Sequence, residues 1–187
     1  MPATTREDIV VLFLDLQDEI VKNSRTVPAE RLRVTAGALA KLAALHALPA
    51  FASAVPPGGA YLREVLAPLP ALEPRMRTQT TAFADQGLVA ELGACGRRTL
   101  VLAGVATEIV VQRTALAALD AGYAVQVAVD ACGGLDARTE DAAWRRVAGA
   151  GGVTTSVTTL AAELAGEFTS DLGGATVGIM YETMGAG

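Results

Sequence analysis

Asp15 is the first residue of the chain whose position suggests chemistry. It directly follows six apolar residues, Ile9 to Leu14, which predict a buried strand. A carboxylate after such a run is costly to bury unless its charge is compensated or used. Because ligands bind beyond the carboxyl ends of the strands in open parallel sheets, Asp15 is a candidate acid–base residue. The alternative is a helix or turn cap.

A second position of interest is the turn between an expected strand and the helix that follows it. The strand Thr99–Val105 ends at Gly104-Val105, and a helical pattern begins just after Thr107. The first N–H groups of that helix should face the ligand edge of the sheet. A cysteine there would have its thiolate favoured and could act as a nucleophile. The turn after this strand and the start of the helix contain no cysteine, and Val110 lies in the first turn of the helix.

The two cysteines and the single histidine limit the chemistry further. Cys95 and Cys132 form neither a disulfide framework nor a metal-ligand spacing, and with His46 alone we expect no metal site. Cys132 follows a strand and could replace a missing nucleophile, although a lone cysteine in a glycine-rich turn is usually a buried filler. Cys95 is expected on the wrong side of the sheet. The glycines at 149–152 precede a strand, so no dinucleotide fingerprint and no cofactor are expected.

Composition indicates a folded protein that binds neither nucleic acid nor membrane. The 187 residues are 51% hydrophobic and 19% charged, with a net charge of −5 and no concentrated basic patch. The apolar run that follows Glu7 and Asp8 is too short for an export signal or a membrane span. We therefore expect a cytoplasmic protein with a small-molecule substrate.

Strand-like and helix-like segments alternate along the chain, which favours an α/β fold: a three-layer α/β/α, Rossmann-like arrangement around a mainly parallel six-stranded sheet. One domain over residues 1–187 is expected, with the regular fold over about 9–168. Strands are predicted at 9–14, 49–55, 75–79, 99–105, 124–129 and 152–157, and helices at 29–45, 61–66, 85–93, 109–121, 136–148 and 158–168.

The segment 169–187 combines glycines with apolar residues such as Ile179 and Tyr181. Alone it would be poorly ordered, so we expect it to dock on a neighbouring subunit of a homo-oligomer, a dimer or larger.

Several short motifs together resemble the isochorismatase-like cysteine hydrolases, in particular the YcaC-like branch. The stretch Gly104-Val105-Ala106-Thr107-Glu108-Ile109-Val110 is similar to that branch's G-V-x-T-E-x-C turn, with Val110 at the nucleophile position. Leu14-Asp15-Leu16-Gln17 resembles the L-D-x-Q setting of the family's catalytic aspartate. Asp130-Ala131-Cys132-Gly133 fits its D-A-x-G turn, and the resemblance spans about residues 9–168.

The resemblance also implies roles for the segment before Phe83. Many family members have K-x-x-x-S-A-F here, which places Arg77 at the catalytic lysine and Thr81 at the serine. Arginine keeps the positive charge but cannot donate a proton, and Arg75 could compete for the role. The alternative for Arg77 is a solvated residue of an edge strand, and Phe83 could be pocket wall or plain core.

The resemblance thus implies Asp15 and Arg77 as catalytic residues. Its implied substrate-binding residues are Gln17, Thr81, Phe83, Thr107 and Val110. Two functions remain open. One is a hydrolase acting without a thiol on a vinyl ether, amide or ester, with Asp15 as acid–base and Arg77 as its electrostatic partner or a grip for an anionic substrate. The other is a catalytically inactive family member that binds a small molecule or serves in assembly.

Overall fold

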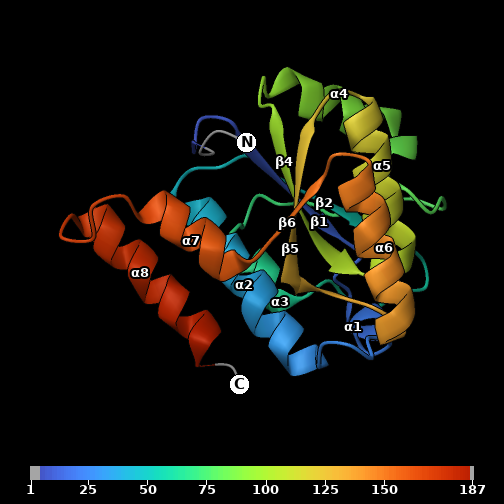
Figure 1. The fold of residues 1–187 in the computed structure, drawn as a ribbon, viewed down its shortest axis with the longest axis horizontal. Coiled ribbons are helices and arrows are strands. Elements are labelled where there is room, and N and C mark those ends of the chain that lie inside the picture. The colour runs from blue at the N-terminus through green and yellow to red at the C-terminus, as the bar shows by residue number, and fades with distance from the viewer. Residues whose placement is uncertain (1–4, 186–187) are drawn as a thin grey trace.

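The computed structural model describes residues 5–185 and is built around one six-stranded sheet (Figure 1). The strand order is β3-β2-β1-β4-β5-β6, and all five neighbouring pairs are parallel. The strands are β1 Ile9–Leu14, β2 Ala50–Ala54, β3 Arg75–Met76, β4 Thr99–Val105, β5 Ala124–Gly133 and β6 Val153–Thr155.

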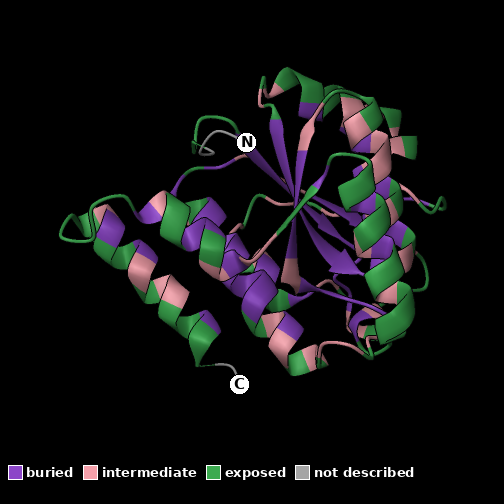
Figure 2. Ribbon diagram, viewed as in Figure 1, coloured by how far each residue is buried: buried purple, intermediate pink, exposed green. Residues whose placement is uncertain are grey.

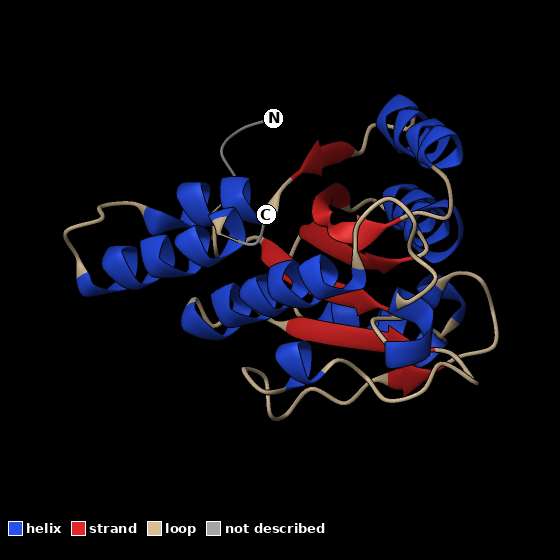
Figure 3. Ribbon diagram, turned by 90° about the horizontal axis from the view of Figure 1, so that it is seen from below, coloured by secondary structure: helices blue, strands red, loops and turns tan. Residues whose placement is uncertain are grey.

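Helices cover both faces of this sheet, which confirms the predicted three-layer α/β/α fold (Figure 3). One apolar core lies between the sheet and α2 and α7, and the other between the sheet and α4, α5 and α6. The helices are α1 Asp18–Val21, α2 Ala29–Leu45, α3 Arg63–Leu66, α4 Gln86–Ala94, α5 Gln112–Asp120, α6 Ala137–Gly149, α7 Val157–Ala165 and α8 Asp171–Met184. A 3₁₀ turn, η1 Ala82–Ala84, and a π-helical turn, η2 Thr107–Val111, complete the elements.

The central strands β1 and β4 correspond to the clearest apolar runs in the sequence. Every residue of β1 and of β4 is buried, as expected for parallel strands covered on both faces. Leu14 pairs with Gly104 at the carboxyl end of the two strands. A side chain on Gly104 would collide with the Leu14 carbonyl, so glycine permits the close approach of the two backbones there. The predicted bounds of β1, β4 and α2 are confirmed.

Other boundaries differ from the sequence predictions. The outer strands β3 and β6 have only two and three residues, because edge strands pair on one side alone. β5 continues to Gly133, beyond the predicted end at 129, because its last residues pair with the end of β4 after a register shift. The helix predicted from Ile109 begins two residues earlier, as the π-helical turn η2.

The C-terminal segment corrects one expectation. Residues 171–184 form helix α8, which packs on α7 and α2 of the same chain. Ser170 caps its first turn by accepting a hydrogen bond from Gly173 N, and Thr176 Oγ1 lies 2.8 Å from His46 Nε2 at the end of α2. The described tail is therefore ordered by its own chain. Its outer side is solvent-exposed (Figure 2), with Tyr181 62% and Met184 61% exposed.

Among residues 5–185, no helix is both long enough and apolar enough to cross a membrane.

Candidate active site

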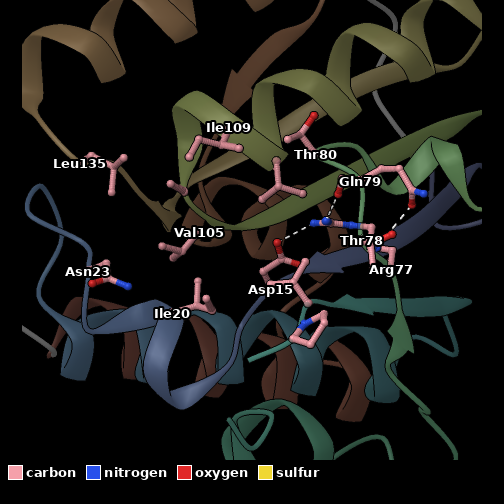
Figure 4. A pocket seen from close by; sticks show the side chains of 14 residues that line it. Asp15, Ile20, Asn23, Arg77, Thr78, Gln79, Thr80, Val105, Ile109 and Leu135 are labelled. Carbon is pink, nitrogen blue, oxygen red and sulfur yellow. Dashed lines mark hydrogen bonds and ion pairs between the residues drawn. The ribbon is translucent and has the colours of Figure 1, made fainter. Parts of the chain in front are cut away.

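A pocket of about 420 Å³ opens at the carboxyl ends of the central strands (Figure 4). Its position agrees with the rule that parallel sheets bind ligands at this edge. Most of its wall is apolar, and its polar side is formed by Asp15 and the segment 77–80. The lining residues are Asp15, Ile20, Asn23, Val55, Pro56, Arg77, Thr78, Gln79, Thr80, Val105, Ala106, Ile109, Val110 and Leu135.

Asp15 enters this pocket because the chain turns sharply at the end of β1. Its φ of 54° lies in the left-handed region, which aspartate tolerates better than most residues. Two backbone hydrogen bonds hold the turn: Asp15 N donates to Ser53 O at 2.9 Å, and Gln17 N donates to Asp15 O at 2.8 Å. Asp15 is not a helix cap, since Gln17 precedes α1.

Arg77 reaches Asp15 from the end of β3. Its backbone N–H donates to Ala54 O at 2.9 Å, which fixes the segment to β2. Arg77 Nη2 donates to Asp15 Oδ2 at 2.5 Å, and Nη1 donates to the carbonyl of Gln79. The two side chains are only 3% and 7% exposed. Arg77 is therefore a buried partner of Asp15 and not a solvated residue of an edge strand.

Arg75 does not compete for this role. Its guanidinium pairs with Asp85 at 2.8 Å and with Glu91 on α4 at 2.9 Å. Neither carboxylate lines the pocket, and Arg75 does not line it either.

Burial dominates the electrostatics of the Asp15–Arg77 pair. Desolvation disfavours the carboxylate and raises the pKa of Asp15 to about 6, although the charge and hydrogen bond of Arg77 act in the opposite direction. Asp15 Oδ1 and Arg77 Nε are buried without a hydrogen-bond partner. The carboxyl group can therefore hold or release a proton near neutral pH.

The wall opposite this pair comes from the end of β4 and from η2. The peptide bond between Val105 and Ala106 is cis, and Val110 contributes a methyl-branched side chain that is 2% exposed. No cysteine is among the lining residues in the described part of the chain. This part of the pocket is therefore apolar and offers no thiol.

Neither Cys95 nor Cys132 supplies the thiol that the pocket lacks. Cys132 lies in β5 beside Gly104, fully buried, and burial raises the pKa of its thiol far above the usual range. Cys95 is half-buried at the end of α4 and burial raises its pKa too. Cys132 has the environment of a buried filler, not of an activated nucleophile.

The structure does not bring four of the predicted substrate-binding residues into the pocket. Gln17 is buried beneath it, where Nε2 donates to the carbonyls of Val55 and Gly59 and Oε1 accepts from Val55 N. Thr107 is buried and donates to Glu140 Oε1 at 2.8 Å. Gln17 holds the loop that follows β2, and Thr107 joins η2 to α6, so the observed contacts of both side chains are structural.

The other two residues, Thr81 and Phe83, do not line the pocket either. Thr81 caps η1 by accepting a hydrogen bond from Phe83 N. Phe83 packs against the core on the α4–α5 side and meets Tyr123 edge to face, with ring centroids 6.0 Å apart. The core alternative for Phe83 is the one observed. Of the predicted site residues, the pocket unites Asp15, Arg77 and Val110.

Several lining residues were absent from the sequence predictions, most clearly Leu135 at the mouth. It is held there by Glu108, whose carboxylate accepts hydrogen bonds from Leu135 N at 2.9 Å and from Thr139 Oγ1 at 2.7 Å. Ile20 and Asn23 come from the segment after β1. Their position next to Asp15 in the sequence was the only available signal, and nothing local distinguishes Leu135.

Comparisons with known proteins agree with this fold. The isochorismatase domain family matches residues 10–159, which is most of the chain, and the protein therefore belongs to the isochorismatase family. Its fold is that of a hydrolase-like member of this family.

The chain is also similar to individual members called YcaC. It is 28% identical over 173 residues to the probable hydrolase YcaC of Escherichia coli, covering 90% of this chain and 83% of the relative. The crystal structure of that YcaC, described as an octameric hydrolase of unknown specificity, superposes with a TM-score of 0.90 at 26% identity, over 98% and 91% of the two chains. YcaC from Pseudomonas aeruginosa, solved with hexane-2,5-diol and covalent acrylamide, gives a TM-score of 0.91 at 26% identity, over 99% and 93%.

Proposed function

We propose that this protein is a hydrolase that acts on a small uncharged molecule, with Asp15 as its acid–base residue and without a cysteine nucleophile. The observation that carries the proposal is the buried Asp15–Arg77 pair at the polar side of a largely apolar pocket. A carboxyl group with a pKa near 6 can exchange protons with a substrate under ordinary conditions.

The charge balance of the pocket supports an uncharged substrate. Among the described residues that line it, Asp15 and Arg77 alone are ionisable, and the Asp15 carboxylate pairs with the Arg77 guanidinium. Two donors of the Arg77 fork already bind Asp15 and the Gln79 carbonyl. An anion would have to compete with Asp15 for Arg77, leaving a buried carboxylate unpaired. This argues against the hypothesis that Arg77 grips an anionic substrate.

The reaction can be completed with these groups and water. Protonated Asp15 donates its proton to the leaving oxygen or nitrogen, or to the carbon of a vinyl ether. Water attacks the electrophilic carbon, the bond to the leaving group breaks, and a proton from the water returns to the carboxylate. Arg77 stabilises that carboxylate in the interval because its charge cannot be titrated. Vinyl ethers, small amides and small esters are the bond classes to test.

The proposal needs no thiol. From the resemblance to the family turn we infer that Val110 occupies the nucleophile position; in support, Val110 lines the pocket. A direct attack by water on an acid-activated substrate avoids a covalent intermediate, which a valine could not form.

A second candidate function is binding without catalysis. The apolar lining of the pocket favours this function, because such a pocket can bind a small molecule whether or not a reaction follows. In that case Asp15 and Arg77 would orient a ligand and would not transfer protons.

The deciding experiment compares wild type with Asp15→Asn across a panel of vinyl ethers, amides and esters, with ligand binding measured in parallel by calorimetry. Asp15→Asn keeps the shape but removes the transferable proton, so we expect turnover to fall about 10²-fold or more with the fold intact. Asp120→Asn, an exposed aspartate on α5, is the matched control and should retain full activity. Full activity in Asp15→Asn would exclude the acid–base role. Binding without turnover of any panel member would favour the second candidate.

We also propose that the chain assembles as a homo-oligomer, because its fold closely matches an octameric YcaC. Light scattering after size exclusion should give a mass several times the 19.1 kDa of one chain. A clean species of one chain mass would contradict this.

A further inference from the structure

We infer that Leu135 is a specificity-determining residue of the pocket: it contacts an apolar portion of the uncharged substrate, and Glu108 is the residue that positions it. The inference rests on the proposed function, because it concerns the part of that substrate that does not react. The substrate class that follows is a neutral molecule with a hydrocarbon chain next to its reactive group.

The pocket has a polar side and an apolar side. Asp15 and Arg77 lie on the polar side, and Figure 4 shows Leu135 on the side opposite Arg77, with Val105 in between. Ile109, from the turn η2, belongs to the apolar wall. A molecule that fills the pocket while its reactive group contacts Asp15 therefore extends along the apolar wall toward Leu135.

Leu135 and Ile109 provide exposed apolar surface at the pocket. Leu135 is 42% exposed and Ile109 is 44% exposed, although both line the cavity. Covering such side chains with a hydrocarbon group removes apolar surface from water, which is favourable. Asn23 lies near Leu135 in Figure 4, but its Nδ2 already donates to Glu19 O at 3.0 Å. This end of the pocket therefore favours a hydrocarbon group over a polar one.

Glu108 fixes the backbone of Leu135. Its Oε1 accepts hydrogen bonds from Leu135 N at 2.9 Å, from Asp136 N at 3.3 Å and from Thr139 Oγ1 at 2.7 Å. Glu108 directly precedes Ile109 in η2. The turn that presents Ile109 to the cavity therefore also anchors the loop that presents Leu135, and the two apolar side chains are held in a fixed relation.

The same loop is held at the residue before Leu135. Gly134 N donates to Thr26 Oγ1 at 2.8 Å, and Gly134 O accepts from Arg25 N at 2.8 Å. The Leu135 side chain is thus exposed while its backbone is anchored on both sides. Withdrawing the loop would break several hydrogen bonds, so Leu135 stays at the pocket and can select substrates by size and polarity.

Binding of 2-alkanones, from acetone to 2-heptanone, tests the inference. These ketones are uncharged and present a carbonyl group to Asp15, but water cannot hydrolyse them. Their dissociation constants are measured by NMR titration of the isotope-labelled protein. In the wild type we expect the affinity to rise about threefold for each added methylene group until the chain covers Leu135.

The decisive variant is Leu135→Ala, with folding checked by circular dichroism. Acetone should bind it as it binds the wild type, whereas 2-heptanone should bind about fivefold more weakly. Leu116→Ala, at a half-buried leucine of α5 outside the pocket, is the matched control and should bind every ketone as the wild type does. An equal loss for both ketones in Leu135→Ala, no loss for either, or a wild type that does not bind 2-heptanone would overturn the inference.

Two variants of Glu108 test its positioning role. Glu108→Ala removes both oxygens that hold Leu135 N and should weaken the binding of 2-heptanone but not of acetone. Glu108→Gln keeps one acceptor oxygen and should restore most of the dependence on chain length. A purely structural defect would lower the binding of all ketones together. Such a uniform loss, or wild-type binding by Glu108→Ala, would exclude the positioning role.

These measurements involve no turnover, so the inference and the proposed activity can fail separately. Loss of the dependence on chain length in Leu135→Ala would support the inference even if no vinyl ether, amide or ester is hydrolysed. Hydrolysis by a Leu135→Ala variant that binds all ketones as the wild type does would support the proposed activity and overturn the inference.

Discussion

Arg77 donates to Asp15 at 2.5 Å although the two residues are 62 positions apart in the sequence and begin from different strands. The contact joins the ends of β1 and β3, which lie on either side of β2. Almost no solvent reaches either side chain, so each charge depends on the other for compensation. The properties of Asp15 should therefore respond strongly to Arg77.

Loss of the Arg77 charge should raise the pKa of Asp15 above about 6. Arg77 is the group that lowers this pKa, through its charge and its hydrogen bond, against the effect of burial. Arg77→Ala removes both contributions, whereas Arg77→Lys keeps the charge and should shift the pKa less and impair turnover less. The measurement is the ¹³C titration of the Asp15 carboxyl group.

Arg75→Ala provides the control for these variants, because Arg75 pairs with Asp85 and Glu91 outside the pocket. It should leave the pKa of Asp15 unchanged. Equal shifts in Arg75→Ala and Arg77→Ala would show that the response is a general effect of removing a cation from this edge.

Stability should depend on pH with the sign set by Asp15. Its pKa is raised on folding from 3.8 to about 6, so the folded state holds the proton more tightly than the unfolded state does. The contribution of Asp15 to the free energy of unfolding is therefore most favourable below pH 4 and falls as the pH rises toward 6. The loss amounts to about 3 kcal/mol.

Urea unfolding at a series of pH values, in wild type and in Asp15→Asn, isolates this contribution because asparagine does not titrate. The difference between the two proteins should change by about this amount from pH 4 to pH 7 and then level off. A difference that is constant across this range would mean that Asp15 has an ordinary pKa in the folded protein.

The sequence predicted the parts of the site that depend on strand ends. β1 and β4 are long apolar runs, so their carboxyl ends, and with them Asp15 and the turn before Val110, could be placed at one edge. The choice of Arg77 over Arg75 was not determined locally. It is decided by Asp85, which caps the first turn of α4, and by Glu91 on α4, because both bind Arg75 instead.

Other features follow from tertiary contacts that no local pattern records. Leu135 lines the pocket because Glu108 binds its backbone N–H from another element. Helix α8 is glycine-rich and weakly helical by composition, yet it forms because α2 and α7 pack against it. Gln17 and Thr107 belong to family-like motifs, but Gln17 binds the loop after β2 and Thr107 binds Glu140 on α6. The motifs thus identified chain segments near the pocket, but they did not distinguish residues that line the pocket from residues that support it.

Cys132 should resist alkylation in the folded protein. It is fully buried in β5, and the raised pKa of its thiol leaves almost no thiolate. Iodoacetamide followed by mass spectrometry should modify Cys95 slowly and Cys132 only after unfolding, and any native activity should persist. Modification of Cys132 in the folded state, with a loss of activity that a bound ligand prevents, would instead identify it as a displaced nucleophile.

Val110→Cys should create a reactive thiol in the pocket. Val110 lines the cavity within the η2 turn that precedes α5, and the dipole at this helix N-terminus favours a thiolate. The size of the side chain barely changes, so the fold should be retained. Val111→Cys is the matched control, because Val111 is the next residue of the same turn and is equally buried but does not line the pocket. Iodoacetamide should label Val110→Cys at least about tenfold faster than Val111→Cys near pH 7, as quantified by mass spectrometry. Equal and slow labelling would contradict the placement of Val110 at a nucleophile position, and with it the alignment of this turn to the family motif.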